Sequence, residues 1–218
     1  MYTPTAFKLD DTAQQLQLMD QYPFATLIAQ GPQGLMAMHL PVLLQRGRDG
    51  GRLHAHIARN NGEFADCPDG TEVLVVFNGP HAYISPSWYP TKKTSNGKAV
   101  PTWNYVAVHV HGVLNHQSDR QWLLSHLDQL VQRHESGRPD PWALADAPDD
   151  YLGMMAGQIV GLDIAITRIE GKAKLSQNRP PVDQRGVVLG LRNPQEPASS
   201  YFCLDIAALI DARLNAKP

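Results

Sequence analysis

Acidic residues are missing from the middle of this 218-residue chain. Residues 73–118 include no Asp or Glu, although they include three lysines and four histidines. Residues 119–163 reverse the balance, because carboxylates outnumber arginines there. A second basic segment, residues 172–185, contains Asp183 as its one carboxylate. The net charge is only −2, so two local basic segments favour a localised anion site over a broad nucleic-acid surface.

Charge, cysteine and long apolar runs are also scarce. Charged residues make up 18% of the chain, below the ~25% usual for soluble domains, which indicates a surface partly covered by a partner subunit or ligand. Cys67 and Cys203 are too few for a disulfide framework and lack a metal-type spacing. The sequence shows no signal-peptide pattern and no apolar run near the ~20 residues that span a bilayer. We therefore expect a cytoplasmic protein with reduced thiols and no membrane segment.

Strand patterns dominate the first half of the chain. A short helix is predicted over residues 10–21, and alternating segments then follow one another through tight turns without intervening helices, from FATLIAQ to VPTWNYVAVHVHG. This order indicates an antiparallel barrel or sandwich. Helical spacing begins after Asp119, and a second helix is predicted near Asp149 before the strand IVGLDIAITRIEG. We predict one domain over residues 1–175 with a helical insertion at about 119–157. A tail over 176–218, with weaker helical patterning, is expected to pack on the barrel or on a partner subunit.

The strand VPTWNYVAVHVHG, residues 100–112, carries bulky side chains on both faces. One face is the valine face, made of Val106, Val108 and Val110. The opposite face carries two aromatic residues and two histidines: Trp103, Tyr105, His109 and His111. A half-exposed strand would place polar residues there. A metal, a ligand or a second copy of the chain would each account for this face.

Two His-x-His pairs are candidate metal chelates, since residues i and i+2 of a strand share a face. The pairs are His54/His56 and His109/His111. A third ligand would have to come from His39, His81 or Glu63, and no spacing selects one of them. We therefore predict no metal site, because histidines in a packed or ligand-lined strand account for both pairs. Glycine-rich phosphate loops, a nucleophile elbow and a helix-turn-helix pattern are all missing from the sequence.

The segment IEGKAKLSQNRP is dense in hydrogen-bond donors. The donors are Lys172, Lys174, Ser176, Gln177, Asn178 and Arg179. Such density suits recognition of a phosphate or of a heteroaromatic edge. The alternative is a solvated turn after the last strand.

Six motifs in order give the chain a family resemblance: MYTPTAF, YPFATLIA, LHAHIARNN, YISPSWY, VPTWNYVAVHVHG and GKAKLSQNRP. From residue 1 to about residue 190 the chain closely resembles the PaiB-type family of FMN-binding negative transcriptional regulators. The resemblance implies a mainly β fold with flanking helices (α+β), namely a flavin-reductase-like split β-barrel related to pyridoxamine-phosphate oxidase. It also implies a homodimer with FMN at the subunit interface.

The resemblance also implies which residues bind FMN. The turn expected along the flavin and its phosphate comprises His56, Ile57, Ala58, Arg59, Asn60 and Asn61. Trp103, Tyr105 and His109 are expected to face the ring or the partner subunit, and Lys174 and Gln177 come from the donor-dense segment. No catalytic residue is assigned. The implied function is a flavin-linked regulator, with DNA or a regulatory protein as a partner that the sequence itself does not support. The alternatives are a flavin-dependent oxidoreductase acting on a small molecule, and a dimeric binding protein without flavin.

Overall fold

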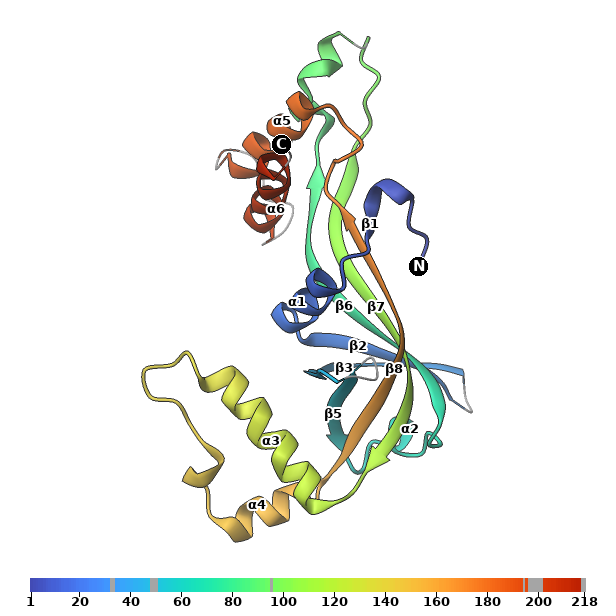
Figure 1. Cartoon of the computed structure of the whole chain (residues 1–218), viewed down its shortest axis with the longest axis vertical. Helices are drawn as coiled ribbons and strands as arrows, with labels where there is room; N and C mark the ends of the chain where they lie inside the picture. Colours follow the sequence, from blue (N-terminus) through green and yellow to red (C-terminus); the bar gives the residue numbers. More distant parts are fainter. Residues whose placement is uncertain (32–33, 48–50, 95, 194, 196–201, 217–218) are drawn as a thin grey trace. The chain divides into compact units, whose positions relative to one another are not determined.

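The computed structural model describes residues 1–31, 34–47, 51–94, 96–193, 195 and 202–216 (Figure 1). The strands are β1 (Lys8–Leu9), β2 (Phe24–Gly31), β3 (Gly34–Pro41), β4 (Leu43–Gln45), β5 (Arg52–Ala58), β6 (Thr71–Ile84), β7 (Thr102–Gln117) and β8 (Ile159–Lys174). The helices are α1 (Thr12–Gln21), α2 (Gly62–Ala65), α3 (Arg120–Glu135), α4 (Asp149–Ala156), α5 (Pro181–Arg192) and α6 (Cys203–Asn215). Short 3-10 turns occupy Thr5–Phe7, Pro86–Trp88, Pro90–Lys93 and Leu144–Asp146.

The strands form one sheet in the order β3-β2-β6-β7-β8-β5-β4, and β1 pairs with β8. The registered pairs are antiparallel, which confirms the mainly β fold with flanking helices. The predicted helix over 10–21 is α1, and the helical spacing after Asp119 corresponds to α3 and α4. In the part of the chain that the structure describes, no helix is long and apolar enough to cross a membrane.

The chain divides into two compact units. Unit 1 comprises Met1–Leu18, Asn78–Val108 and Glu170–Pro218, and unit 2 comprises Met19–Phe77 and His109–Ile169. The long strands β6, β7 and β8 each contribute one part to either unit. The domain limits expected from the sequence, 1–175 and 176–218, stay a prediction.

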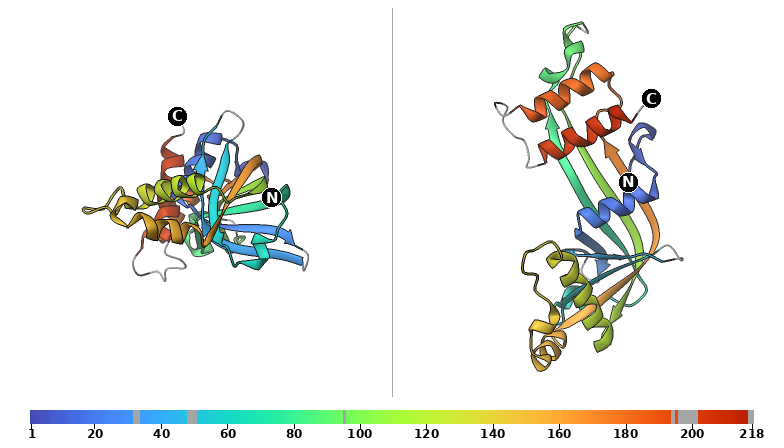
Figure 2. Two further views of the ribbon diagram at one scale, coloured as in Figure 1. Left: turned by 90° about the horizontal axis from the view of Figure 1, so that it is seen from below. Right: turned by 60° about the vertical axis from the view of Figure 1, so that its left-hand side comes forward.

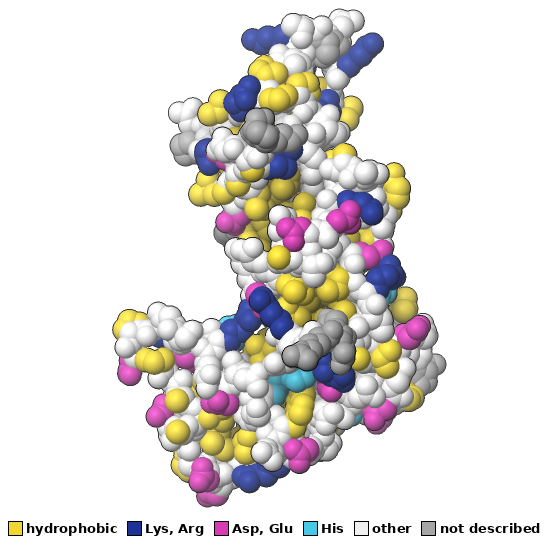
Figure 3. All heavy atoms as spheres, viewed as in Figure 1, with side chains coloured by type: hydrophobic (Ala, Val, Ile, Leu, Met, Phe, Trp, Pro, Cys, Tyr) yellow, Lys and Arg dark blue, Asp and Glu magenta, His cyan; other side chains and the backbone are white. Residues whose placement is uncertain are grey.

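Unit 2 is built on β2 to β5 with parts of the three long strands. Strand β5 pairs with β8 so that His54 lies opposite Asp163 and His56 opposite Gly161. Alternate residues of these strands, such as Leu53 and Leu162, are fully buried, as the strand period of two requires. Helix α3 begins where the Asp119 side chain accepts a hydrogen bond from the Trp122 amide at 2.8 Å. In the space-filling view, hydrophobic and acidic side chains share the surface of the α3–α4 segment (Figure 3).

Unit 1 contains the C-terminal helices, and α5 and α6 lie side by side (Figure 2). The indole of Trp88 rests on α5 at Gly190, and the Trp88 carbonyl lies against Gly186, so a Cβ atom at either glycine would collide with Trp88. The buried carboxylate of Asp183 accepts hydrogen bonds from the Thr91 amide at 3.0 Å and the Thr91 hydroxyl at 2.7 Å. The segment before β7 is therefore fastened to the first turn of α5.

The two faces of β7 differ as the sequence predicts. The valine face is buried in the unit 1 part and in the unit 2 part of β7, since Val106, Val108 and Val110 are at most 4% exposed. Side chains of the opposite face are exposed, as for Trp103, or half-buried, as for Tyr105 and His109. A single chain thus leaves this face of β7 open.

Candidate functional site

An aromatic cluster lies on the open face of β6 and β7 in unit 1. We call it the unit 1 aromatic cluster, and its members are His81, Tyr83, Trp103 and Phe202. The Trp103 ring lies 6.0 Å from the His81 ring and 6.2 Å, edge to face, from the Tyr83 ring. The indole of Trp103 is 46% exposed and the phenol of Tyr83 is 36% exposed. Exposed aromatic faces of this kind can stack against a planar ring.

Two lysine ammonium groups are held beside the aromatic residues of unit 1. The Nζ of Lys172 lies 5.1 Å from the centre of the Tyr105 ring and donates a hydrogen bond to the Tyr2 carbonyl at 3.0 Å. The Nζ of Lys174 donates to Oγ1 of Thr102 at 2.5 Å. Thr102 precedes Trp103, so this ammonium is held at the start of β7, the strand that carries the exposed indole.

The donor-dense segment folds back on the end of β8. The Gln177 side chain accepts a hydrogen bond from the Leu175 amide at 2.6 Å and donates to the Ala173 carbonyl at 2.5 Å. Ser176 has a φ of 59° and accepts, at Oγ, a hydrogen bond of 2.8 Å from Nδ2 of Asn104. The Oδ1 atom of Asn104 is buried without a hydrogen-bond partner. Buried side-chain oxygens usually accept a hydrogen bond, so the Oδ1 atom of Asn104 is an exception among the described residues of unit 1.

The turn at residues 56–61 belongs to unit 2 and makes mainly structural contacts. The Arg59 guanidinium donates to the carbonyls of Gly157 at 2.8 Å and Ile159 at 2.9 Å. Asn61 caps α2, because its Oδ1 accepts a hydrogen bond from the Phe64 amide at 3.2 Å. Asn60 and Ala58 are exposed, Ile57 is buried, and Nδ1 of His56 lies 3.0 Å from Nε2 of His126.

The residues expected from the sequence therefore fall into two groups. Unit 1 contains Trp103, Tyr105, Lys174 and Gln177. Unit 2 contains the turn at 56–61 and His109. Sequence reasoning missed His81 and Tyr83, although their i, i+2 spacing in β6 is the signal that places them on one face.

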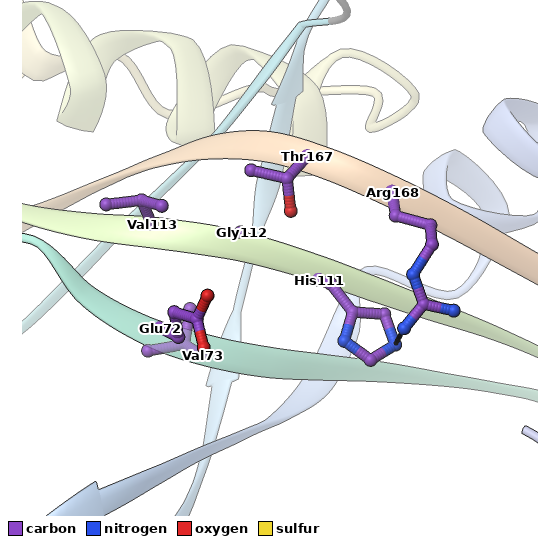
Figure 4. Close-up of a pocket in the computed structure, with 7 residues that line it drawn as sticks. All are labelled: Glu72, Val73, His111, Gly112, Val113, Thr167 and Arg168. Carbon is purple, nitrogen blue, oxygen red and sulfur yellow. Dashed lines mark hydrogen bonds between the residues drawn. The ribbon is translucent and has the colours of Figure 1, made fainter.

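A pocket of about 250 Å³ in unit 2 was also not foreseen. Its lining includes Glu72, His111, Thr167 and Arg168, from β6, β7 and β8 (Figure 4). The guanidinium of Arg168 lies 2.9 Å from Nε2 of His111, so this nitrogen accepts and the ring proton is assigned to Nδ1. Gly112 is required in this wall, because a Cβ there would press on the Ile164 side chain and the Ala165 carbonyl of β8.

The family of the chain follows from comparison with known proteins. Residues 1–168 match the family described as "Putative FMN-binding domain". The chain belongs to this FMN-binding family. The match confirms the resemblance stated from the motifs, and it makes FMN the cofactor of the chain.

Two curated relatives differ in how much of their length they share with this FMN-binding chain. The Bacillus subtilis "Protease synthase and sporulation protein PAI 2" is 31% identical over 197 residues, which cover 90% of this chain and 92% of that protein. An uncharacterized protein of Aspergillus fumigatus is 35% identical over 153 residues, which cover 63% of this chain and 58% of that protein. The chain thus spans less than two thirds of the fungal relative and nearly all of the bacterial one.

Solved structures support the fold of the family. The FAD and heme binding protein of Mycobacterium smegmatis has a TM-score of 0.53 and 16% identity, covering 75% of this chain and 71% of that chain. A conserved hypothetical protein of Mycobacterium tuberculosis also has a TM-score of 0.53, with 13% identity, covering 83% of this chain and 94% of that chain. At these identities the likeness concerns the fold alone, which is the split β-barrel expected from the sequence.

The chemistry of unit 1 fits FMN. The cofactor has a planar aromatic ring and a phosphate dianion, and unit 1 offers an exposed indole with the Lys174 ammonium fixed beside its strand. Within the described residues, no group of three His, Cys, Asp or Glu side chains is arranged to hold a metal ion.

Proposed function

We propose that this chain is a flavin-linked regulator of the PaiB type that binds FMN and acts as a cytoplasmic homodimer. The observation that carries the flavin part is the exposed indole of Trp103 on a chain whose residues 1–168 match the FMN-binding family. The regulatory part is supported by similarity to the Bacillus subtilis protein named for protease synthesis and sporulation. The oxidoreductase alternative has no observation in its favour among the residues that the structure describes.

The proposed roles of the residues follow from their chemistry. FMN, when bound, supplies a ring that absorbs visible light and accepts electrons. Trp103 stacks on the ring, with Tyr83 and His81 holding the indole in place. Lys174 provides a charge-assisted hydrogen bond to the phosphate. Arg59 and the neighbouring asparagines of the turn at 56–61, in unit 2, are the alternative proposed phosphate contact, although two of the Arg59 donors are already on backbone carbonyls.

The homodimer accounts for the open face of β7. Charged residues make up only 18% of the chain, and along that face Trp103 is exposed while Tyr105 and His109 are half-buried. We expect the dimer to bury more than the ~1,600 Å² of a standard interface, as stable homodimers do. Light scattering at micromolar concentration should give twice the chain mass. A monomeric mass would remove the dimer from the proposal.

The spectrum of freshly purified protein tests FMN binding. We expect the flavin absorption bands, and FMN as the species released on heat denaturation. If the protein is purified without cofactor, FMN added to it should lose fluorescence as the ring stacks. A colourless protein that leaves FMN fluorescence unchanged would refute the flavin part of the proposal.

A gel-shift assay tests the regulatory part. The DNA upstream of the protein's own gene is the probe, and both the FMN-loaded and the cofactor-free protein are used. We expect retardation that differs between the two forms and weakens as salt rises, because phosphate contacts release counterions. No retardation by either form, with FMN bound, would refute direct action on DNA while leaving the flavin part in place.

A further inference from the structure

A buried histidine of α3 docks onto the first His-x-His pair. Strand β5 presents His54 and His56 on the same face, and α3 of unit 2 covers them. The side chain of His126 is only 1% exposed. Its Nε2 lies 3.0 Å from Nδ1 of His56, and its ring centre lies 6.4 Å from that of His54. Three imidazoles therefore meet where the helix contacts the strand.

Trp122, one turn earlier in α3, completes the contact. Its ring stacks on His126 at 5.4 Å with an angle of 20° between the planes, and it lies 4.9 Å from the His54 ring. Gly161, opposite His56 in β8, provides the space, because a Cβ at Gly161 would collide with the Trp122 ring. We call this set, His54, His56, His126 and Trp122, the histidine latch.

The latch has no counter-charge for a protonated His126. The Nδ1 atom of His126 is buried without a hydrogen-bond partner. The carboxylate of Asp163 on β8 lies 3.4 Å from His54, but Arg52 of β5 already donates to both of its oxygens, at 2.5 and 2.7 Å. The groups whose charge bears on His126 are His54 and His56, which repel it when they are protonated.

Other elements packed on α3 direct their charged groups elsewhere. At the far end of the helix, Arg133 contacts Asp20. On the α4 side, the Arg120 guanidinium lies against Gly153. A proton on His126 is therefore stabilised only when its imidazole reaches water.

We propose that the histidine latch is an acid-sensitive contact. It keeps α3 docked on β5 while the imidazoles are neutral and releases the helix when they take up protons. This device lies in unit 2 and does not depend on the proposed FMN site. Protonation is the signal, and release of α3 increases the solvent exposure of Trp122 and of the His54/His56 face of β5.

The protonation equilibria agree with this geometry. Burial, reinforced by the charges of His56 and His54, lowers the pKa of His126 from 6.5 to about 3. Burial also lowers the pKa of His56 and, against the opposing pull of Asp163, the pKa of His54. Because the docked pKa values lie below the ordinary value, docking is fully stabilised above pH 6.5 and weakens as the pH falls. Each histidine that must protonate on release lowers the ratio of docked to released protein by up to about tenfold per pH unit below 6.5.

Hydrogen exchange on the full-length protein measures release directly. Protection of the α3 amides is compared with that of the α5 amides between pH 7.5 and 5, after correction for the intrinsic exchange rates. We expect α3 protection to fall about tenfold or more per pH unit below pH 6.5, with α5 protection unchanged. In His126→Gln the fall should be shallower, since Gln can hydrogen-bond to His56 but cannot be protonated. The matched control is His134→Gln, which removes an exposed histidine from the same helix and should behave as the wild type.

Three outcomes would overturn the proposal: α3 protection that stays flat down to pH 5, α3 and α5 losing protection together, or a His126→Gln profile identical to the wild type. If His126→Gln does not fold, proton NMR of the wild-type histidines decides. We expect His126 to remain neutral until α3 is released. A His126 that titrates near pH 6.5 while α3 stays protected would equally reject the latch.

Discussion

The pairs His54/His56 on β5 and His109/His111 on β7 share a spacing, but their surroundings differ. Helix α3 covers the first pair with Trp122 and His126. The second pair is half-buried on the open face of β7, where His111 contacts Arg168. Strand alternation decides that each pair shares a face, whereas residues distant in sequence decide what covers it. The first pair is therefore part of the packing between a helix and a strand, whereas the second stays partly exposed to solvent.

The largest expected difference is in the free energy of unfolding when a tryptophan of the covered face or of the open face is replaced by alanine. Trp122→Ala removes the ring that packs against His126, His54 and the Gly161 backbone, and should lower the free energy of unfolding by about 3 kcal/mol. Trp103→Ala is the matched control and should cost less than about 1 kcal/mol, because Trp103 is 46% exposed. Urea denaturation of both variants measures the difference. Equal losses would contradict the contrast between a covered and an open face.

Removing a phosphate-binding cation should have the next largest effect. Lys174→Ala should weaken FMN binding roughly ten- to a hundred-fold, since a charge-assisted hydrogen bond contributes about 1.5–3 kcal/mol. Arg59→Ala is predicted to do the same if Arg59 also touches the phosphate. Riboflavin, which lacks the phosphate, should lose little affinity in either variant. Titration of cofactor-free protein by flavin fluorescence measures both ligands.

The control for these cation variants is Lys98→Ala, which removes an exposed charge from residues 73–118, the segment without Asp or Glu. It should leave FMN affinity within about twofold of the wild type, because surface charges act weakly through water. Arg59→Ala also deprives two backbone carbonyls of their donor. A stability loss in that variant with equal effects on FMN and riboflavin would assign Arg59 to structure alone.

Loss of the stacking ring should have a smaller effect on binding. Trp103→Ala should weaken FMN and riboflavin equally, by roughly three- to tenfold, because an aromatic pair contributes about 0.5–1.5 kcal/mol beyond area burial. Trp142→Ala removes another exposed tryptophan, in unit 2, and should change neither affinity. If Trp103→Ala binds both flavins with unchanged affinity, the flavin ring does not bind at the unit 1 aromatic cluster.

Chelation should have the smallest effect of all. We predict that neither His-x-His pair holds a structural metal, so dialysis against EDTA should leave the melting temperature unchanged. Elemental analysis of protein purified without a His tag should show no stoichiometric metal. A chelator-dependent drop in melting temperature would show that one pair is a metal site.

The sequence predicted what depends on local pattern. The valine face of β7 is buried, and the helices after Asp119 lie where the spacing of Trp122 and Leu123 indicated. The motifs predicted the family and its cofactor, and the match over residues 1–168 confirmed both. The pattern also places His54 and His56 on one face, but it does not say which element covers that face.

Long-range contacts were beyond the sequence. The sequence gives no reason to single out His126, because no local signal joins it to His56, 70 positions away. The Arg59 guanidinium was assigned to a phosphate, and only the fold shows Gly157 and Ile159 within its reach. His81 could have been foreseen, since it alternates with Tyr83, but its contact with Phe202 crosses from β6 to the start of α6.

A titration of cofactor-free wild-type protein with FMN and with riboflavin tests the central claim most directly. The claim is that a flavin ring binds the open aromatic face while cations hold its phosphate. We predict that both flavins bind and that FMN binds roughly ten- to a hundred-fold more tightly, the difference being one or two charge-assisted hydrogen bonds. Equal affinities would contradict the phosphate site, and no binding of either flavin would contradict the account as a whole.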